Sequence, residues 1–321
     1  MVKDREPNYS ALADRCGLNS NKDEKEVIEG IQALEEEYET DNLVLIYNYF
    51  LANCKNPRLL SEIIKCSDRL RDKSSLPYLV DILLLKSENS EEINRDDYIN
   101  ARVLAAKAIA NLKDTTAVNS LLYCLNNKNE NYKVRFACAD ALGKIGDRYA
   151  VIPLIDVMKD EDEKSIYIRE SAASALGMLG DVRAIEPLVN ILETKNGIID
   201  KFTFLKERVL EALGKLKIGE NQRVFDAVKK SLIDESPQIR INAIEAIMES
   251  ENPDAYDTIK PSLKDSDDEV KRNAIIALYN LVGRDILDEV ISSPEYSDFL
   301  KIEAVSMIDE YESDSEDFDD K

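Results

Sequence analysis

The sequence contains no histidine and no tryptophan, and glycine and proline are scarce at 10 and 9 residues. Histidine is the commonest general base and metal ligand in proteins, so its absence excludes every catalytic triad built on imidazole. Few glycines and prolines indicate a chain made mostly of helix with short turns. No run approaches the roughly 18 apolar residues of a membrane span, and the first ten residues lack the apolar core of a signal peptide.

Positive charge is also in short supply. Lysine and arginine number 42 against 64 aspartates and glutamates, which gives a formal net charge of −22. A field of this sign repels phosphate backbones and anionic lipid headgroups, so neither nucleic acid nor a membrane is an expected partner. We expect instead a protein partner, such as a basic peptide or helix, and we favour a monomeric chain.

The sequence lacks the motifs of the common catalytic and cofactor sites. It contains no G-x-x-x-x-G-K-[ST] loop, no G-x-G-x-x-G before a helix and no G-x-S-x-G turn, so we expect no enzyme activity, no cofactor and no metal. The five cysteines are odd in number and form no C-x-x-C pair. We interpret them as reduced thiols, which are typical of a cytoplasmic protein.

The sequence does contain an internal repeat. VRFACADALGKIGDRYAVIPLIDVM at 134–158 returns as IRESAASALGMLGDVRAIEPLVNIL at 168–192. The first half recurs near residues 101, 239 and 270, and two weaker copies begin near residues 205 and 300. Apolar residues recur in each copy with helical spacing, and the copies are about one helix–turn–helix unit apart.

The turn that follows the second helix of a repeat also recurs in two copies within this chain. Gly146 and Gly180 are expected to end a helix in a left-handed conformation, and the aspartate after each glycine is expected to cap the next helix. Pro153 and Pro187 are predicted to kink that next helix in the same way. Small residues such as Ala141 are predicted to let neighbouring helices approach closely.

A basic residue stands near the start of the second helix in most copies. We expect it to satisfy carbonyls of the preceding turn and to pair with an aspartate six residues upstream. Stacked copies would then form a ladder of ion pairs. The predicted ladder consists of Arg102, Arg135, Arg169, Arg240 and Lys271, with the aspartates Asp234 and Asp265.

The pattern VR..A..ALG.IGD..A..PL at 134–154, with its match at 168–188, resembles the HEAT repeat, specifically the HEAT-like subclass named after phycobilin lyase subunits. The resemblance implies an all-α fold, a right-handed α-α superhelix of the HEAT/armadillo-like solenoid type. The predicted organisation is a polar N-terminal arm at 1–22, a single solenoid of about eight helix pairs at 23–310, clearest at 97–310, and an acidic disordered tail at 311–321.

The subclass includes chromophore lyases, scaffolds and regulatory subunits, so the resemblance indicates fold more than function. We expect a non-catalytic scaffold, adaptor or regulatory subunit that binds proteins through a concave solenoid surface. The alternative is a bilin lyase or a lyase-like chromophore chaperone subunit. Some HEAT-repeat enzymes hold two irons through His-Glu pairs, and the lack of histidine excludes that chemistry in its known form.

Two surfaces are predicted to contact a partner. The first is the loop at 193–204, whose apolar residues either pack on a neighbouring repeat or face a partner: Ile198, Ile199, Phe202 and Phe204. The second is the inner face of the solenoid, where the second helices are expected to point one residue per copy outward: Asp140, Ser174, Glu211 and Glu245. The frequent carboxylates favour a basic peptide or helix there, and a plain solvated surface is the alternative.

Overall fold

The computed structural model describes residues 7–18, 20, 22–85, 96–193, 203–216 and 221–319, with the side chains of Thr203 and of residues 310–319 left out. Within these ranges the chain forms eighteen α-helices, joined by turns and short 3₁₀ segments, and no β-strand. The predicted all-α class is therefore confirmed. The chain divides into two compact units, unit 1 at Met1–Ala175 and unit 2 at Leu176–Lys321.

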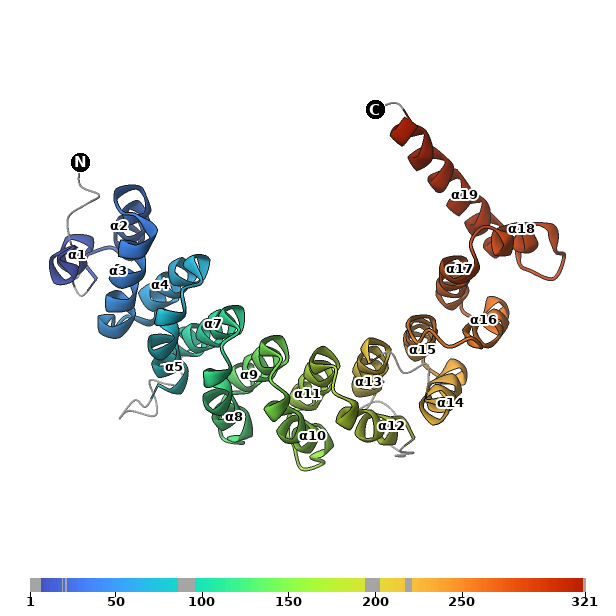
Figure 1. Cartoon of the computed structure of the whole chain (residues 1–321), viewed down its shortest axis with the longest axis horizontal. Helices are drawn as coiled ribbons and strands as arrows, with labels where there is room; N and C mark the ends of the chain where they lie inside the picture. The colour runs from blue at the N-terminus through green and yellow to red at the C-terminus, as the bar shows by residue number, and fades with distance from the viewer. Residues whose placement is uncertain are drawn as a thin grey trace. The chain divides into compact units, whose positions relative to one another are not determined.

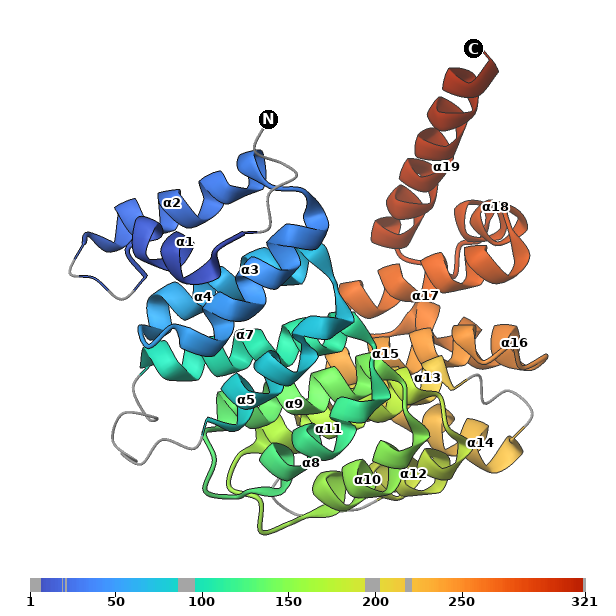
Figure 2. The same ribbon diagram turned by 60° about the vertical axis from the view of Figure 1, so that its left-hand side comes forward.

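Unit 1 stacks helical hairpins, each made of a first helix and a second helix. The second helices α7 and α9 lie side by side in one layer, and the first helices α5 and α8 lie in the other (Figures 1 and 2). The helices that begin in unit 1 are α1 (Tyr9–Cys16), α2 (Glu24–Glu37), α3 (Thr40–Asn53), α4 (Pro57–Leu70), α5 (Leu76–Leu84), α7 (Asp96–Leu112), α8 (Val118–Asn126), α9 (Tyr132–Ile145), α10 (Val151–Lys159) and α11 (Ile166–Leu179).

Unit 2 continues the same two-layer plan within itself. Its second helices pack in succession, α13 on α15, α15 on α17 and α17 on α19, while the first helices α12 and α14 contact each other. The helices are α12 (Ile185–Glu193), α13 (Thr203–Lys215), α14 (Gln222–Lys230), α15 (Pro237–Glu249), α16 (Ala255–Ile259), α17 (Asp268–Val282), α18 (Asp285–Ser292) and α19 (Asp298–Asp319).

The turn after α9 shows how the sequence joins one hairpin to the next. Gly146 adopts a φ of +81°, a left-handed conformation that glycine reaches without a Cβ clash. The side chain of Asp147 then accepts a hydrogen bond of 2.9 Å from the N–H of Tyr149. Gly180 and Asp181 repeat the turn after α11. The predicted caps are confirmed at both positions.

The prolines do not kink a helix interior, so that prediction is wrong. Pro153 is the third residue of α10, in its first turn, and the 3₁₀ segment η3 (Arg148–Ala150) comes directly before this helix. A proline in the first turn of a helix costs little, because N–H groups there lack helical partners. The 3₁₀ segment η2 (Thr115–Ala117) precedes α8, which has no proline. The 3₁₀ segment before the first helix of a repeat therefore does not depend on proline.

Small residues lie where the second helices approach each other. Ala141 and Ala175 are fully buried. In unit 2, a Cβ added to Gly177 would lie 2.8 Å from the Cα of Ala212, closer than atoms can pack. The predicted close approach of small residues is therefore confirmed.

The two ends of the chain differ from the sequence prediction. Residues within the predicted polar arm form α1, whose Leu12, Ala13 and Cys16 are buried and which contacts α2 and α3. One turn of apolar spacing is too short to give a periodic signal, which explains the difference. At the other end α19 continues as helix to Asp319, past the start of the predicted tail. No glycine or proline interrupts this acidic stretch.

Candidate functional site

The ladder arginines reach back to the first helix of their own repeat. The Nε atoms of Arg102, Arg135 and Arg169 each donate a hydrogen bond of 2.8 Å to the carbonyl oxygen of the penultimate residue of that helix, respectively Leu83, Leu125 and Met158. All three arginines are buried. The predicted role of satisfying carbonyls is therefore confirmed, and it explains why a guanidinium is used at this position.

The terminal N–H groups of Arg102 and Arg135 bind a carboxylate of the next repeat. In unit 1, Nη1 and Nη2 of Arg135 donate to the two oxygens of Glu163 at 3.0 and 2.7 Å, and both side chains are only 4% exposed. Arg102 binds Glu130 in the same two-pronged way. Glu163 also accepts the N–H of Ser165. Each pair thus fastens one repeat to the loop of the next.

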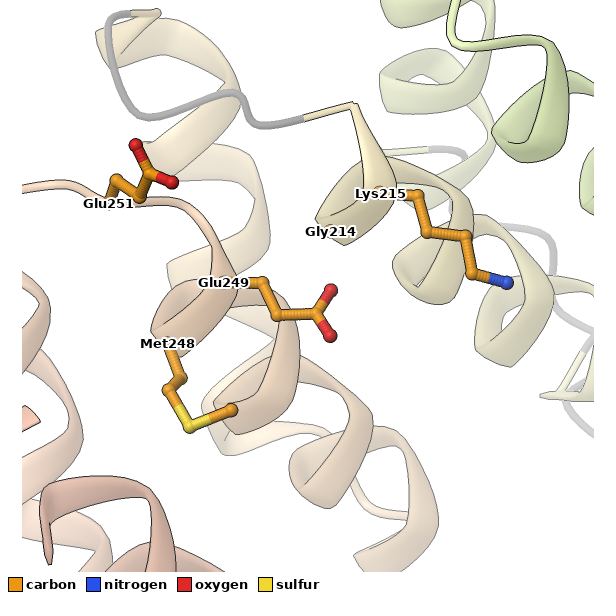
Figure 3. A pocket seen from close by; sticks show the side chains of 5 residues that line it. All are labelled: Gly214, Lys215, Met248, Glu249 and Glu251. Atoms are coloured by element: carbon orange, nitrogen blue, oxygen red, sulfur yellow. The ribbon is translucent and has the colours of Figure 1, made fainter. Parts of the chain in front are cut away.

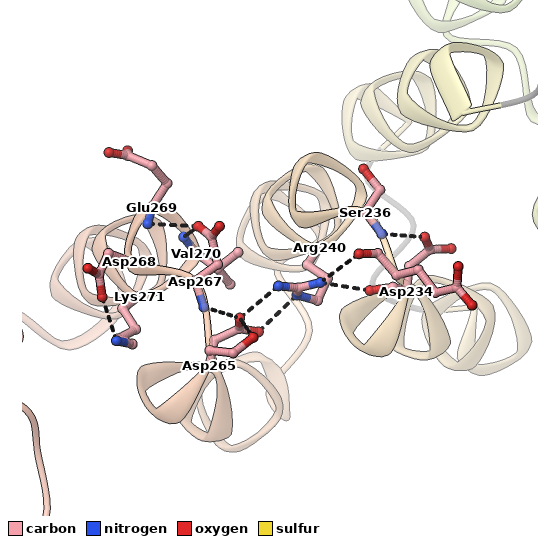
Figure 4. A network of polar contacts seen from close by, with 11 residues as sticks. Asp234, Ser236, Arg240, Asp265, Asp267, Asp268, Glu269, Val270 and Lys271 are labelled. Carbon is pink, nitrogen blue, oxygen red and sulfur yellow. Dashed lines mark hydrogen bonds and ion pairs between the residues drawn. The ribbon is translucent and has the colours of Figure 1, made fainter. Parts of the chain in front are cut away.

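The same arrangement in unit 2 is shown in Figure 4, around Arg240. Its Nη1 donates to the carbonyl oxygen of Asp234 at 2.8 Å, and its Nε and Nη2 donate to the carboxylate of Asp265 at 2.9 and 2.8 Å. The carbonyls of its own turn hold one side of the guanidinium, so the other side faces the next repeat.

The predicted pairing with an aspartate six residues upstream is consequently wrong. Asp265 binds Arg240 and not Lys271, whose Nζ lies 2.6 Å from Asp268 one turn away. Asp234 lies 3.6 Å from the Nζ of Lys206, the basic residue of the preceding copy. Asp234 and Asp265 lie at the predicted sequence positions, but each pairs with the basic residue of the preceding repeat.

The pKa of Glu163 shows how tightly the ladder is built. Burial opposes ionisation of this carboxyl, but hydrogen bonds from Arg135 and Ser165 and the charge of Arg135 outweigh it. The pKa of Glu163 therefore lies below its ordinary value. The same balance, with Arg240 as the cation, lowers the pKa of Asp265. The ladder joins repeats inside each unit and offers little charged surface to a partner.

The second helices of unit 2 expose a group of carboxylates. Glu211 is held by Lys215 and Arg208, each at 2.6 Å, and these hydrogen bonds lower its pKa although burial opposes them. Glu245 forms no ion pair in the described part of the chain. Its pKa is raised by partial loss of water and by the charges of Glu249 and Glu211. Two predicted residues thus lie in one acidic cluster.

Glu249 lies one turn beyond Glu245 and borders a pocket of about 350 Å³. Its carboxylate folds over Gly214, where an added Cβ would lie 2.7 Å from Oε2. Lys215, Met248 and Glu251 complete the lining, from the ends of α13 and α15 (Figure 3). The volume is at the lower end of the range for ligand pockets, and Met248 is the one apolar side chain among the lining residues.

In unit 1 the predicted residues Asp140 and Ser174 do not form a uniform stripe. The carboxylate of Asp140 binds Lys144 at 2.7 Å, and Ser174 is half-buried on α11. The exposed face of α9 carries Phe136 one turn before Asp140, and Tyr132 one turn earlier again. Sequence reasoning did not single out these aromatic residues, although their spacing of four places them on the stripe of Asp140.

Three aromatic side chains are exposed together on the second helices of unit 1. We call Tyr132, Phe136 and Tyr167 the aromatic face, since they are 48%, 47% and 57% exposed. The rings of Tyr132 on α9 and Tyr167 on α11 lie 6.2 Å apart between centroids. Exposed aromatic groups on neighbouring elements are typical of protein interaction surfaces.

The predicted contact loop is only partly described. Ile198, Ile199 and Phe202 lie outside the described residues. Phe204, the second residue of α13, is 61% exposed. A role of this loop in binding stays a prediction.

Comparison with known families agrees with this geometry. A model of HEAT repeats matches residues 87–166 and 200–279, and a model of the PBS lyase HEAT-like repeat matches residues 168–194. The chain is a HEAT-repeat protein. No curated protein matches the sequence closely enough to count as a relative. Along the described residues of this HEAT-repeat protein, no helix has both the length and the apolar composition needed to cross a bilayer.

Solved structures place the HEAT-repeat chain among α-solenoids. A chain in the structure of Kap95p with RanGDP is 14% identical and has a TM-score of 0.59, over 93% of this chain and 46% of that one. The complex of CpcE and CpcF of phycocyanin lyase from Nostoc sp. PCC7120 is 23% identical, with a TM-score of 0.46 over 74% and 87%. A computationally designed armadillo repeat protein for peptide recognition is 19% identical, with a TM-score of 0.42 over 64% and 99%.

Proposed function

We propose that this HEAT-repeat protein is a non-catalytic scaffold or adaptor that binds a protein partner on the second helices of unit 1. The observation that carries the proposal is the aromatic face of Tyr132, Phe136 and Tyr167. Large aromatic side chains supply much of the binding energy of protein interfaces and lose little conformational entropy on binding.

The fold itself does not require aromatic residues at these positions. The position of Phe136, one after the ladder arginine, is occupied by Glu170 in the next copy and by Arg272 in α17. The position of Tyr167 is occupied by Lys133 in α9 and by Gln238 in α15. Polar residues are thus compatible with the repeat, so the aromatic face is better explained by binding than by folding.

The charge of the chain indicates what kind of partner would fit. Asp140 lies one turn from Phe136, and the net charge of the chain is −22. Lysine and arginine side chains bind favourably over aromatic rings, and the acidic field attracts them. We therefore propose a basic peptide or helix as the partner, bound by apolar contact with the aromatic face and by charge around it.

Affinity purification from the native host with mass spectrometry tests the proposal. The bait carries Tyr132→Ser and Phe136→Ser, and the matched control carries Tyr123→Ser and Tyr149→Ser, which are similarly exposed tyrosines outside the aromatic face. We expect a partner to be recovered with the wild-type and control baits and lost with the first variant. Equal recovery with all three folded baits would refute this binding surface.

The alternative of a bilin lyase subunit has a direct test of its own. Mixing the protein with phycocyanobilin should leave the absorption spectrum of the pigment unchanged if the chain is a scaffold. A shift that persists through gel filtration would favour the lyase alternative and count against the non-catalytic assignment.

A further inference from the structure

Each second helix of unit 2 turns one side toward the second helix that follows it. This side holds the residues one, four and eight places after the ladder residue. One place after the ladder residue of α13, the backbone carbonyl of Glu207 accepts a hydrogen bond of 3.5 Å from the side-chain amide of Asn242 on α15. One place after the ladder residue of α17, Arg272 binds Glu303 of α19 at 2.8 Å. We call this side the forward face.

The residue four places after the ladder residue shows whether a further helix covers the forward face. Leu210 on α13, Ile244 on α15 and Ile275 on α17 occupy this position, and all three are fully buried. Each of these helices is followed by another second helix packed against it. Burial at this position is therefore the sign of a filled forward face.

The last second helix breaks this pattern. The ladder position of α19 is Lys301, so its forward face holds Ile302, Val305 and Asp309. Ile302 is 68% exposed, Val305 is 44% exposed and Asp309 is exposed. In the portion of the chain that the structure describes, no helix covers Ile302 and Val305, although the next second helix covers the corresponding face of α13, α15 and α17.

The helices that fill a forward face show what an incoming helix looks like. The neighbour of Gly177 is Ala212, and the neighbour of Gly214 is Ala246, both at the sixth position of the incoming helix. The corresponding residue of α17, Ala277, is also buried. The incoming helices α13, α15 and α17 therefore present a small residue where the two backbones come closest, whereas α19, on the forward face of α17, carries Met307 at this position.

Such a helix would come from a second copy of this chain or from another protein, and charge distinguishes the two. Asp298 and Asp309 are exposed at the two ends of the open segment, and the sequence from 309 to 321 is acidic with a single lysine. A second copy of this chain would bring like charges together, whereas a basic helix would neutralise them.

We propose that the open forward face of α19 binds an amphipathic α-helix of another protein, with alanine or glycine at the centre of its apolar side and lysine or arginine along its edges. The bound helix occupies the place that the next second helix would fill. It covers Ile302 and Val305, and its basic residues face Asp298 and Asp309. This site is separate from the aromatic face, so each can fail without the other.

The test uses a synthetic helical peptide of alanine, leucine and lysine, and a matched peptide with glutamate in place of lysine. Binding to the full chain is measured by fluorescence anisotropy at low and high salt. We expect the lysine peptide to bind, more weakly at high salt, and the glutamate peptide not to bind. Ile302→Ser with Val305→Ser should weaken binding about tenfold or more, since two apolar contacts are lost.

Two controls separate this site from a general attraction to acidic protein. Ile233→Ser removes an isoleucine that is 87% exposed elsewhere in unit 2, and Tyr149→Ser removes an exposed tyrosine outside the aromatic face. Both should leave peptide affinity unchanged, and circular dichroism checks the fold of each variant. Absence of peptide binding, or equal binding by the Ile302/Val305 variant, overturns the proposal. A dimer in light scattering that this variant abolishes would overturn it in favour of a second copy.

Discussion

Unit 1 and unit 2 share one repeat but expose different chemistry on their second helices. The exposed positions carry the aromatic face in unit 1 and the carboxylates Glu211, Glu245 and Glu249 in unit 2. The ladder pairs vary as well: Arg135–Glu163 in unit 1 is buried and Lys206–Asp234 in unit 2 is longer and more exposed, although Arg240–Asp265 in unit 2 is short and mostly buried. Core and turns follow the repeat, so function has to be sought at the exposed positions.

The largest expected effect is the loss of a ladder pair in unit 1. Arg135→Ala leaves the Glu163 carboxylate buried without its cation and should cost about 3–5 kcal/mol of unfolding free energy. Lys206→Ala in unit 2 removes a pair at 3.6 Å whose side chains are 27% and 24% exposed, and it should cost below about 1 kcal/mol. Urea unfolding followed by circular dichroism measures both. Equal losses would show that the two pairs contribute equally to stability, contrary to their burial.

Overpacking should affect both units alike, because both use small residues at their crossings. Ala141→Leu in unit 1 and Gly177→Ala in unit 2 should each cost about 1–3 kcal/mol, since the added atoms meet backbone or fully buried neighbours. Lys144→Leu, at an exposed position of α9, is the control and should be near neutral. Thermal unfolding checks the series, and a neutral Gly177→Ala would contradict the close approach to Ala212.

Acid should weaken the ladder in a predictable direction. The pKa of Glu163 is lowered in the folded chain, so the unfolded chain binds this proton more tightly. The resulting stability is fully present above the ordinary glutamate pKa of about 4.3 and is lost as pH falls through the lower folded value. Glu163→Gln should therefore lose stability at neutral pH and show a flatter decline between pH 5 and 3 (roughly the titration range of carboxylates). An unchanged slope would contradict this role.

The sequence predicts the parts of this fold that repeat and fails where a single side chain chooses between partners. Gly146, Asp147 and the buried alanines follow from local rules, because caps and helix periodicity act within a few residues. The carboxylate partner of Arg240 does not follow, since Asp234 and Asp265 are both within reach in sequence and only the stacking of repeats decides. The aromatic face could not be predicted, because the sequence alone does not show which side of α9 stays exposed.

The smallest expected effect tests the acidic cluster of unit 2, where two neighbouring glutamates should respond with opposite sign. The pKa of Glu245 is raised by loss of water and by Glu249 and Glu211, so ionised Glu245 opposes folding above its folded pKa. Glu245→Gln should stabilise the protein at pH 7 by about a few tenths of a kcal/mol, because solvent screens an exposed group. Glu211→Gln should destabilise it by a similar amount, since Lys215 and Arg208 lose their partner. Urea unfolding of the two variants measures the difference, and a shift of the same sign in both would show that the carboxylates do not repel each other as their positions imply.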